Sequence, residues 1–441
     1  MMVADGDDRG SRQLSPEETR RRVDASLRRR YRRERMFRFY GLFSVCLGVV
    51  FLLLLFGTII GNGYSAFRQS FLQLDIHFDA DVIDPDGARD PDALSVADYS
   101  LLVKSALREL VPEAASRSEK RELNQLVSAG AIFSLRDAVM ADPQILGQTR
   151  SLWLPLNSEV DLWLKAQASG KGADDGSGRL SEQQLVWLER LRAGDRIELR
   201  FNRAFFTSGD SREPELAGIW GATKGSFFML LVTLLLSFPL GVAAAIYLEE
   251  FASRSWWVDV VEVNINNLAA VPSIVFGLLG LAVFINFFGL PRSAPLVGGL
   301  VLTLMTLPVV IIASRAAIKA VPPSVREAAL GIGASQMQMV FHHVLPLAMP
   351  GMLTGAIIGM ARALGESAPL LMIGMVAFIV DVPSGPMSPS TALPVQIYLW
   401  ADSPERAFVE RTSAAIMVLL AFLLVMNATA VWLRSRFERR W

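Results

Sequence analysis

The stretch that decides the fold runs from 322 to 350, P-P-S-V-R-E-A-A-L-G-I-G-A-S-Q-M-Q-M-V-F-H-H-V-L-P-L-A-M-P, between two long apolar runs. Its leading prolines suit the first turn of a helix, where a missing N–H costs little. Gly331 and Gly333 weaken that helix, and a second helical piece is expected over 334–346, ending at a proline. The stretch therefore predicts a short helix–turn–helix at a membrane edge, with little side-chain bulk at its turn.

The composition indicates a membrane protein. Of the 441 residues, 52% are hydrophobic, and the mean hydropathy of +0.36 is too high for a soluble protein of average composition. The formal net charge is +0, so bulk electrostatics gives no sign of a nucleic-acid partner. The single cysteine excludes a disulfide within the chain, and the three histidines lack metal-ligand spacing with nearby carboxylates. No metal site is therefore expected.

Several apolar runs approach the length of about 20 residues that a helix needs to cross a bilayer. They lie at roughly 39–60, 224–248, 267–289, 296–317, 351–380 and 412–433. The expected fold class is an all-α polytopic membrane bundle of about six transmembrane helices, with an inserted small α+β domain outside the cytoplasm.

Basic residues gather on one side of this arrangement. Residues 1–38 are rich in arginine and precede the first apolar run, so the N-terminus is expected in the cytoplasm. The later segments that fall on the same side contain Arg254, Arg315, Lys319, Arg326, Arg434, Arg436, Arg439 and Arg440. We therefore expect a multi-pass membrane protein, surrounded by lipid, with both termini and the segment 318–350 in the cytoplasm.

Residues 61–219 would then lie outside the cytoplasm as the α+β module. Strands are expected near 71–83 and 196–201, helices near 94–111, 117–140 and 180–193, and a flexible loop at 170–178. The last helix would open with a capping box formed by Ser181 and Gln184. A run of aspartates from Asp75 to Asp86 lacks the glycine and the terminal glutamate of a calcium loop, so a solvated acidic edge is expected there.

The chain is thus expected to consist of a basic tail (1–38), a first transmembrane helix (39–60), the insert (61–219), a transmembrane domain (220–434) that contains the loop 322–350, and a C-terminal tail (435–441). Within the transmembrane domain, prolines and glycines are expected to kink helices and to let them pack closely. These residues are Pro272, Pro308, Pro346, Gly277, Gly280, Gly298 and Gly299.

The segment 322–350 resembles the EAA loop of ABC-importer permeases, the cytoplasmic loop that docks on the ATPase subunit. The matching positions are Glu327, Ala328, Ala329, Gly333, Leu345 and Pro346. His343 stands where the family usually has an apolar residue, a minor departure. The small residues Ala328, Ala329, Gly331 and Gly333 would let another protein's backbone approach closely. Without the resemblance, the same segment would be interpreted as an ordinary amphipathic connector.

Three further stretches resemble the phosphate-importer branch of this family, the PstA family. They are P-L-G-V-A-A-A-I-Y-L-E-E at 239–250, N-L-A-A-V-P-S-I-V-F-G at 267–277 and A-R-A-L-G-E-S-A-P-L-L at 361–371. With the loop they follow the family's order from about residue 214 to the C-terminus, roughly half of the chain. The insert 61–219 is much longer than in many members, and its role is left open.

The resemblance implies the permease subunit of an ATP-driven phosphate importer of the bacterial inner membrane. Its expected partners are a second, homologous permease, a cytoplasmic ATPase dimer and an extracytoplasmic phosphate-binding protein. The chain has no GxxxxGK[ST] loop, so it is expected to be no enzyme and to bind no cofactor, with ATP and Mg on the partner ATPase. A permease for another oxyanion, such as molybdate or phosphonate, is the alternative. A membrane sensor with 61–219 as its ligand domain is a second alternative, but it would require a cytoplasmic signalling domain.

Charged residues in the fifth apolar run indicate an anion pathway. Arg362 and Glu366 are four residues apart and would share one helix face. Ionisable groups within a span are costly and normally face a bundle interior or a water-filled cavity. The planar guanidinium of arginine, with its fork of N–H donors, suits phosphate oxygens. Ser367 adds a hydroxyl, and Gly365 and Pro369 favour a kink. The pair is expected near the cytoplasmic third of the span, where Arg362 could instead snorkel or form a purely structural ion pair.

Overall fold

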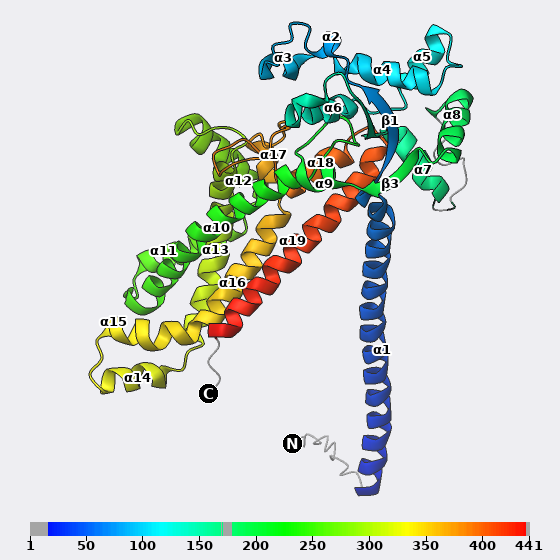
Figure 1. The fold of residues 1–441 in the computed structure, drawn as a ribbon. Helices are drawn as coiled ribbons and strands as arrows, with labels where there is room; N and C mark the ends of the chain where they lie inside the picture. The colour runs from blue at the N-terminus through cyan, green and yellow to red at the C-terminus, as the bar shows by residue number, and fades with distance from the viewer. Residues whose placement is uncertain (1–15, 169, 171–178, 438–441) are drawn as a thin grey trace, which may run out of the picture. The chain divides into compact units, whose positions relative to one another are not determined.

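The computed structural model describes residues 16–168, 170 and 179–437, and it divides into two units, Met1–Ile59 and Ile60–Trp441 (Figure 1). The first unit is most of one helix, α1 (Pro16–Gly63), of 48 residues. The helix begins well before the expected span, because the arginine-rich segment that precedes the span is also helical. Its apolar residues, such as Phe43 and Leu53, are exposed, which suits a helix surrounded by lipid.

The second unit opens with the α+β insert. A three-stranded antiparallel sheet has the order β2-β1-β3, formed by β1 (Arg68–His77), β2 (Thr149–Pro155) and β3 (Ile197–Phe201). Around it lie η1 (Tyr64–Phe67), α2 (Ala80–Ile83), α3 (Pro91–Val96), α4 (Tyr99–Leu110), α5 (Arg117–Asn124), α6 (Gly130–Ala141), η2 (Pro143–Ile145), α7 (Ser158–Ala168), α8 (Glu182–Ala193) and α9 (Arg203–Thr207). Every second residue of β1 from Leu72 to Ile76 is buried, so this strand supplies the centre of the core.

The acidic run explains where the first strand ends. The expected strand over 71–83 is wrong beyond His77, because Asp79 caps α2 by accepting a hydrogen bond from the amide of Asp81. Asp90 and Asp98 cap α3 and α4 in the same way. Of the acidic run, Asp79 thus serves as a helix cap, whereas Asp75, Asp81 and Asp86 are exposed to solvent as expected. Across the described residues, no group of three potential ligand side chains could hold a metal ion.

The other expectations for the insert were partly correct. The capping box of Ser181 and Gln184 is confirmed at the start of α8. The helix expected over 117–140 is two helices, α5 and α6, because the chain between them pairs with the sheet through the bridge from Val127 to Leu156. β2 and α7 were not expected. The loop 170–178 lies almost wholly outside the described residues.

The rest of the second unit is a helix bundle. Its helices are α10 (Trp220–Ile246), α11 (Trp256–Ala269), α12 (Ser273–Gly280), α13 (Pro295–Lys319), α14 (Pro323–Gly331), α15 (Gln336–Gln338), α16 (Leu345–Gly365), α17 (Ala368–Met372), α18 (Leu393–Ala401) and α19 (Ala407–Phe437). The π-helical segments η5 (Tyr247–Phe251), η6 (Leu281–Phe287) and η7 (Met339–Val344) extend α10 and α12 and precede α16.

The described chain has five helices that are long and apolar enough to cross a membrane, or six if one bent pair is a single span. The bent pair is α11 with α12 and η6, and the chain bends by 100° between its halves, beside Pro272. The third expected span is therefore not a continuous helix. The fifth was expected to reach residue 380, but α16 ends at Gly365, because Glu366 adopts an extended conformation.

Close packing of small residues holds the bundle together. A Cβ added to Gly299 of α13 would lie 2.6 Å from the Cβ of Val232 in α10. One added to Gly277 of α12 would lie 2.7 Å from the Cα of Pro369. The expected role of these glycines in helix packing is confirmed.

The two ends of the bundle in residues 60–441 are built from different elements (Figure 1). At the start of α10, an apolar core that includes Ala66, Phe205 and Trp400 joins the insert to α18 and α19. At the far end of α10, another core that includes Ile246 and Ala329 joins α13 to the segment 322–350. The 27 residues of α10 separate these cores by about 40 Å.

Candidate functional site

The hairpin formed by α14, α15 and η7 is held by its backbone at a single turn. Gly333 has a φ of +88°, which side-chain-bearing residues rarely adopt. The amide of Ala334 donates to the carbonyl of Ala329 at 3.1 Å, and the amide of Gly333 donates to the carbonyl of Leu330 at 3.0 Å. These two bonds are the Schellman ending of a helix. The structure thus contains the expected helix–turn–helix, with its turn at the second glycine.

The outer surface of the hairpin is small at the turn and apolar around it. A Cβ added to either Gly331 or Gly333 would meet no atom within 4 Å. Ile332 between them is 82% exposed, and Leu330 and Met337 are also exposed. Such contiguous apolar exposure at a helix turn is typical of a protein–protein contact.

The E-A-A triplet divides between the outer surface and the core. Ala329 is buried in the apolar core with Ile246 and Val340, whereas Glu327 and Ala328 are exposed. Within the described part of the chain, the carboxylate of Glu327 has no side-chain hydrogen bond or ion pair. Glu327 is therefore available to a partner, while Ala329 packs α14 against the bundle.

The second helical piece does not end at Pro346, as was expected. It runs from α15 through η7 directly into α16, with Leu345 and Pro346 in the first turn of that helix. A π-helical stretch shifts the hydrogen-bonding pattern by one residue, so a proline that lacks an N–H is accommodated. The hairpin is consequently one continuous body with α16.

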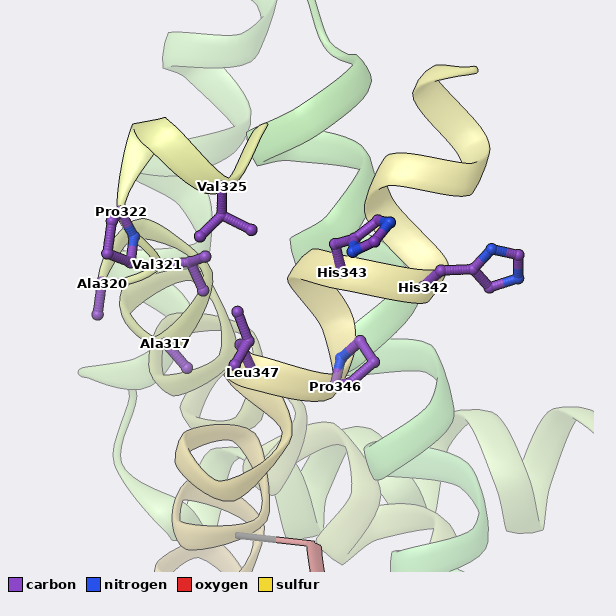
Figure 2. Close-up of a pocket in the computed structure, with 9 residues that line it drawn as sticks. All are labelled: Ala317, Ala320, Val321, Pro322, Val325, His342, His343, Pro346 and Leu347. Carbon is purple, nitrogen blue, oxygen red and sulfur yellow. The ribbon is translucent and has the colours of Figure 1, made fainter. Parts of the chain in front are cut away.

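A groove of about 610 Å³ lies on the inner side of the hairpin, between the end of α13 and η7 (Figure 2). It is lined by Ala317, Ala320, Val321, Pro322, Val325, His342, His343, Pro346 and Leu347. Its walls are mostly apolar. The His342 ring points away from the other labelled side chains.

One carboxylate at the end of α10 and one on α11 pair with the cations of α13. The Nε of Arg315 donates to Glu249 at 2.5 Å, and its Nη2 donates to Glu262. Lys319, one turn further along α13, lies 3.3 Å from the same carboxylate of Glu249. Arg315 therefore ties α10, α11 and α13 together just below the hairpin.

A second ion pair holds the hairpin itself. Arg326 of α14 lies 2.8 Å from Glu250, whose side chain is 6% exposed. The same guanidinium donates to the carbonyls of Val321 at 2.7 Å and Ile318 at 2.9 Å. Gln336, on the other arm, donates to the carbonyl of Glu250 at 2.5 Å. Both arms of the hairpin are thus fixed to the end of α10.

These ion pairs were missed by the sequence analysis, which used Arg315, Lys319 and Arg326 only to orient the chain. A signal was present in the pair Glu249 and Glu250, which closes an apolar run. Carboxylates at the edge of a span are costly without cations, so partners from a neighbouring span could have been sought.

Arg362 and Glu366 lie elsewhere, at the other end of α16. Their side chains approach to 3.5 Å, and they are 51% and 22% exposed. Arg362 lies in the last turn of α16, about 26 Å along the helix from Leu345. Arg362 was expected in the cytoplasmic third of its span, which is the third next to the hairpin. It lies at the opposite end of α16, so this expectation is wrong. The carbonyl of Ser367, next to Glu366, accepts hydrogen bonds from the first turn of α17.

The site thus has two separate parts. Its hairpin can bind another protein through an apolar turn, and it is fixed to the end of α10 by the ion pair of Arg326 with Glu250 and by a hydrogen bond from Gln336. Its second part is an arginine at a helix end, half exposed, with a single weak carboxylate contact. That arginine retains most of its capacity to bind an anion, since a guanidinium has five N–H donors.

Comparison with known proteins matches both halves of the chain to families. The profile of the binding-protein-dependent transport system inner membrane component matches residues 237–441, and that of a domain of unknown function (DUF3333) matches residues 24–173. A probable ABC transporter permease protein of Bacillus subtilis, YqgI, is 31% identical over 251 residues, covering 54% of this chain and 84% of the relative.

Further relatives are named for phosphate transport. The phosphate transport system permease protein PstA 1 of Mycobacterium tuberculosis is 33% identical over 225 residues, covering 51% of this chain and 72% of the relative. Among solved structures, an inward-facing MetNI methionine ABC transporter is 18% identical to this chain, with a TM-score of 0.41. The match covers 50% of this chain and 98% of that one. The identities over most of the length of these permeases establish that the chain belongs to the family of binding-protein-dependent transport system inner membrane components, the permease subunits of ABC importers.

Proposed function

We propose that this permease carries inorganic phosphate into the cell. The observation that carries the proposal is the similarity of its membrane half to permeases named for phosphate transport. The half-exposed guanidinium of Arg362 gives that similarity a chemical basis, because its planar fork matches phosphate oxygens. Glu366 would orient the fork or accept a hydrogen bond from a protonated phosphate, and Ser367 would add a hydroxyl.

In this proposal the hairpin is the coupling element. The exposed turn around Gly331 and Gly333 would insert into a cytoplasmic ATPase dimer that holds ATP and Mg, with Glu327 facing a polar group of that partner. The continuity of the hairpin with α16 supports this role, since a push on the turn would move a helix that carries Arg362 at its far end. A second, homologous permease and an extracytoplasmic phosphate-binding protein would complete the importer.

The orientation follows from the distribution of charge. Arg315, Lys319 and Arg326 lie at the hairpin end of the bundle, and Arg434 of α19 donates to Thr354 near the same end. We place this end and both termini in the cytoplasm, and the insert outside. A reporter active only outside the cytoplasm should be active when fused near residue 150 and silent near residue 335. Activity at residue 335 would contradict both the orientation and the docking of the hairpin.

Anion uptake tests the substrate. In cells lacking this chain, expression of the wild-type protein should restore uptake of labelled phosphate. An excess of unlabelled phosphate should compete, whereas molybdate and phosphonate should not. Restoration of molybdate or phosphonate uptake with no effect on phosphate would replace the proposed substrate by that oxyanion.

A further inference from the structure

A buried cluster of charged side chains lies where the insert meets α19. The ammonium of Lys165, on α7, lies 2.7 Å from Asp161 on the same helix and 2.6 Å from Glu410 in the first turn of α19. The side chains of Lys165 and Glu410 are 9% and 10% exposed. This ion pair joins residues that are 245 positions apart in the chain.

Two further charged groups complete the cluster. Arg411, next to Glu410, is 3% exposed and lies over the ring of Phe205, 5.6 Å from its centroid. Glu215 is 1% exposed and lines the same small cavity of about 10 Å³ as Asp161 and Arg411. One nitrogen of Arg411, Nη1, has no hydrogen-bond partner among the described residues. Removing one partner of a buried ion pair such as Lys165 with Glu410 is strongly destabilising, because the other charge is left uncompensated.

The cluster is bound into the insert as well as into α19. Asp161 accepts a hydrogen bond from the amide of Ser70 in β1 at 2.7 Å, and the carbonyl of Glu215 accepts one from Gln69 at 3.0 Å. The central strand of the sheet is thereby connected to the charges on α19. A domain held only by a flexible tether would not bury five charged groups against the helix next to it.

Apolar packing fixes the same junction. A Cβ added to Gly63 would lie 2.8 Å from the backbone nitrogen of Ala414, so the chain entering the insert lies directly against α19. Ala66, Phe408 and Ala414 share one core. The insert and the first turns of α19 therefore form one packed body.

α19 connects this body with the hairpin end of the bundle (Figure 1). It packs along α16 and reaches Arg434, whose guanidinium donates to Thr354 of α16 at 3.3 Å. Glu410 and Arg434 are about 36 Å apart along the helix. A displacement of the insert would consequently reach α16, the helix that continues the hairpin.

We propose that the insert takes part in the transport cycle. Lys165, Glu410 and Arg411 are positioning residues through which the insert determines the position of α19. The insert then controls how ATP hydrolysis at the hairpin is coupled to movement of substrate. The proposal rests on the chain being an ABC permease and holds whichever anion is carried.

The test uses the complete importer in proteoliposomes, with uptake, ATP hydrolysis and the amount of assembled complex measured for three variants. Lys165→Met leaves Glu410 and Asp161 without their cation, so it should reduce the assembled complex several-fold. Lys165→Met with Glu410→Gln removes one charge of each sign and keeps the net charge of the cluster. It should restore most of the assembly, because Asp161 still accepts the hydrogen bond from the Ser70 amide. The double variant should still transport about tenfold less substrate per ATP, because the ionic link to α19 is gone.

Arg179→Gln is the matched control. Arg179 also bridges the insert and the segment before α19, at 3.8 Å from Glu405, and it pairs with Glu159 of α7 at 2.9 Å, but its own side chain is 52% exposed. Such a surface pair contributes little, so this variant should behave as the wild type. Hydrogen exchange of residues 407–414 should accelerate only in the Lys165 variants.

A double variant with normal transport per ATP and normal exchange would overturn the proposal and leave the cluster a purely structural contact. A single Lys165→Met variant that assembles and transports normally would overturn it as well. A wild-type complex that transports another anion but no phosphate would contradict only the proposed substrate. The role of the insert would still be tested, because the amount of anion transported per ATP hydrolysed can be measured with either anion.

Discussion

Arg326 of the hairpin and Glu250 at the end of α10 form an ion pair of 2.8 Å, although 76 positions separate them in the chain. The same guanidinium caps two carbonyls of the segment that leads from α13 into the hairpin. This one side chain therefore fixes the hairpin relative to two spanning helices. Because the carboxylate of Glu250 is almost completely buried, its charge depends on Arg326 for compensation.

The first prediction concerns this pair. Arg326→Gln leaves the Glu250 charge buried and alone, which should cost about 3 kcal/mol of stability and loosen the hairpin. ATP hydrolysis should persist in the complex that still assembles, while anion uptake per ATP falls. Thermal unfolding and the uptake-to-hydrolysis ratio measure the two effects.

Two variants control for this interpretation. Arg326→Gln with Glu250→Gln should recover much of the stability, because neither charge is left unpaired. Arg190→Gln breaks an exposed ion pair with Glu113 in the insert and should change little. Equal effects of the Arg190 and Arg326 variants would show that the pair at the hairpin has no special role.

The second prediction concerns the turn. Gly333→Arg should allow the chain to insert but block uptake, because its bulk prevents the hairpin from seating in the ATPase. Gly333→Ala should cost about 1 kcal/mol through the positive φ without adding comparable bulk, so it should retain part of the uptake. Gly331→Ala should be tolerated, since that residue has helical geometry and open space. Normal uptake and normal co-purification of the ATPase with Gly333→Arg would contradict the docking.

The third prediction concerns the anion pathway. Arg362→Lys keeps the charge but loses the fork, so it should retain some phosphate uptake, whereas Arg362→Gln should lose nearly all of it. Assembly should be unchanged in both, because the contact with Glu366 is half exposed. The measurement is uptake per assembled complex. Full uptake by Arg362→Gln with Glu366→Gln would identify the pair as structural and exclude a role in translocation.

The fourth prediction concerns pH at the junction between the insert and α19. Burial raises the pKa of the Glu215 carboxyl, outweighing the opposite influence of Ser128 and Arg411, while Glu213 raises it further. Asp161 and Lys165 face the same cluster from α7, and Glu410 and Arg411 face it from α19. The folded protein therefore binds the Glu215 proton more tightly than the unfolded chain.

The sign of the pH effect follows from this difference in affinity. The stability that the Glu215 proton contributes is fully present below the ordinary carboxyl pKa of 4.5 and is lost as the pH rises through the raised value. Glu215→Gln should remove this component and raise thermal stability at neutral pH relative to the wild type. A wild-type and a Gln variant with parallel stability profiles between pH 5 and about 8 would contradict the assignment.

Local patterns predicted much of the fold. The capping box of Ser181 and Gln184 identified a helix, and the apolar runs identified five of the spans. Where tertiary contacts compete with local signals, the sequence was insufficient. Pro346 was expected to end a helix, but a π-helical stretch accommodates it, and Glu366 ends a span that hydropathy alone would continue.

The parts of the site that depend on distant residues could not be predicted. Glu327 and Gly333 were identified from one short motif. Arg326 with Glu250, and Lys165 with Glu410, come from separate elements, and no spacing rule connects them. Charges at the ends of apolar runs indicate that partners exist, but only the packing of the helices identifies which partners they are.

The central claim, ATP-driven import of phosphate through a hairpin docked on an ATPase, is tested most directly by transport into proteoliposomes that contain the assembled complex in known orientation. We predict that labelled phosphate accumulates only when ATP is supplied on the hairpin side and phosphate with its binding protein on the insert side. Accumulation should be abolished by Gly333→Arg. ATP hydrolysis without phosphate accumulation by the wild-type complex, or accumulation with ATP supplied on the insert side, would contradict the account.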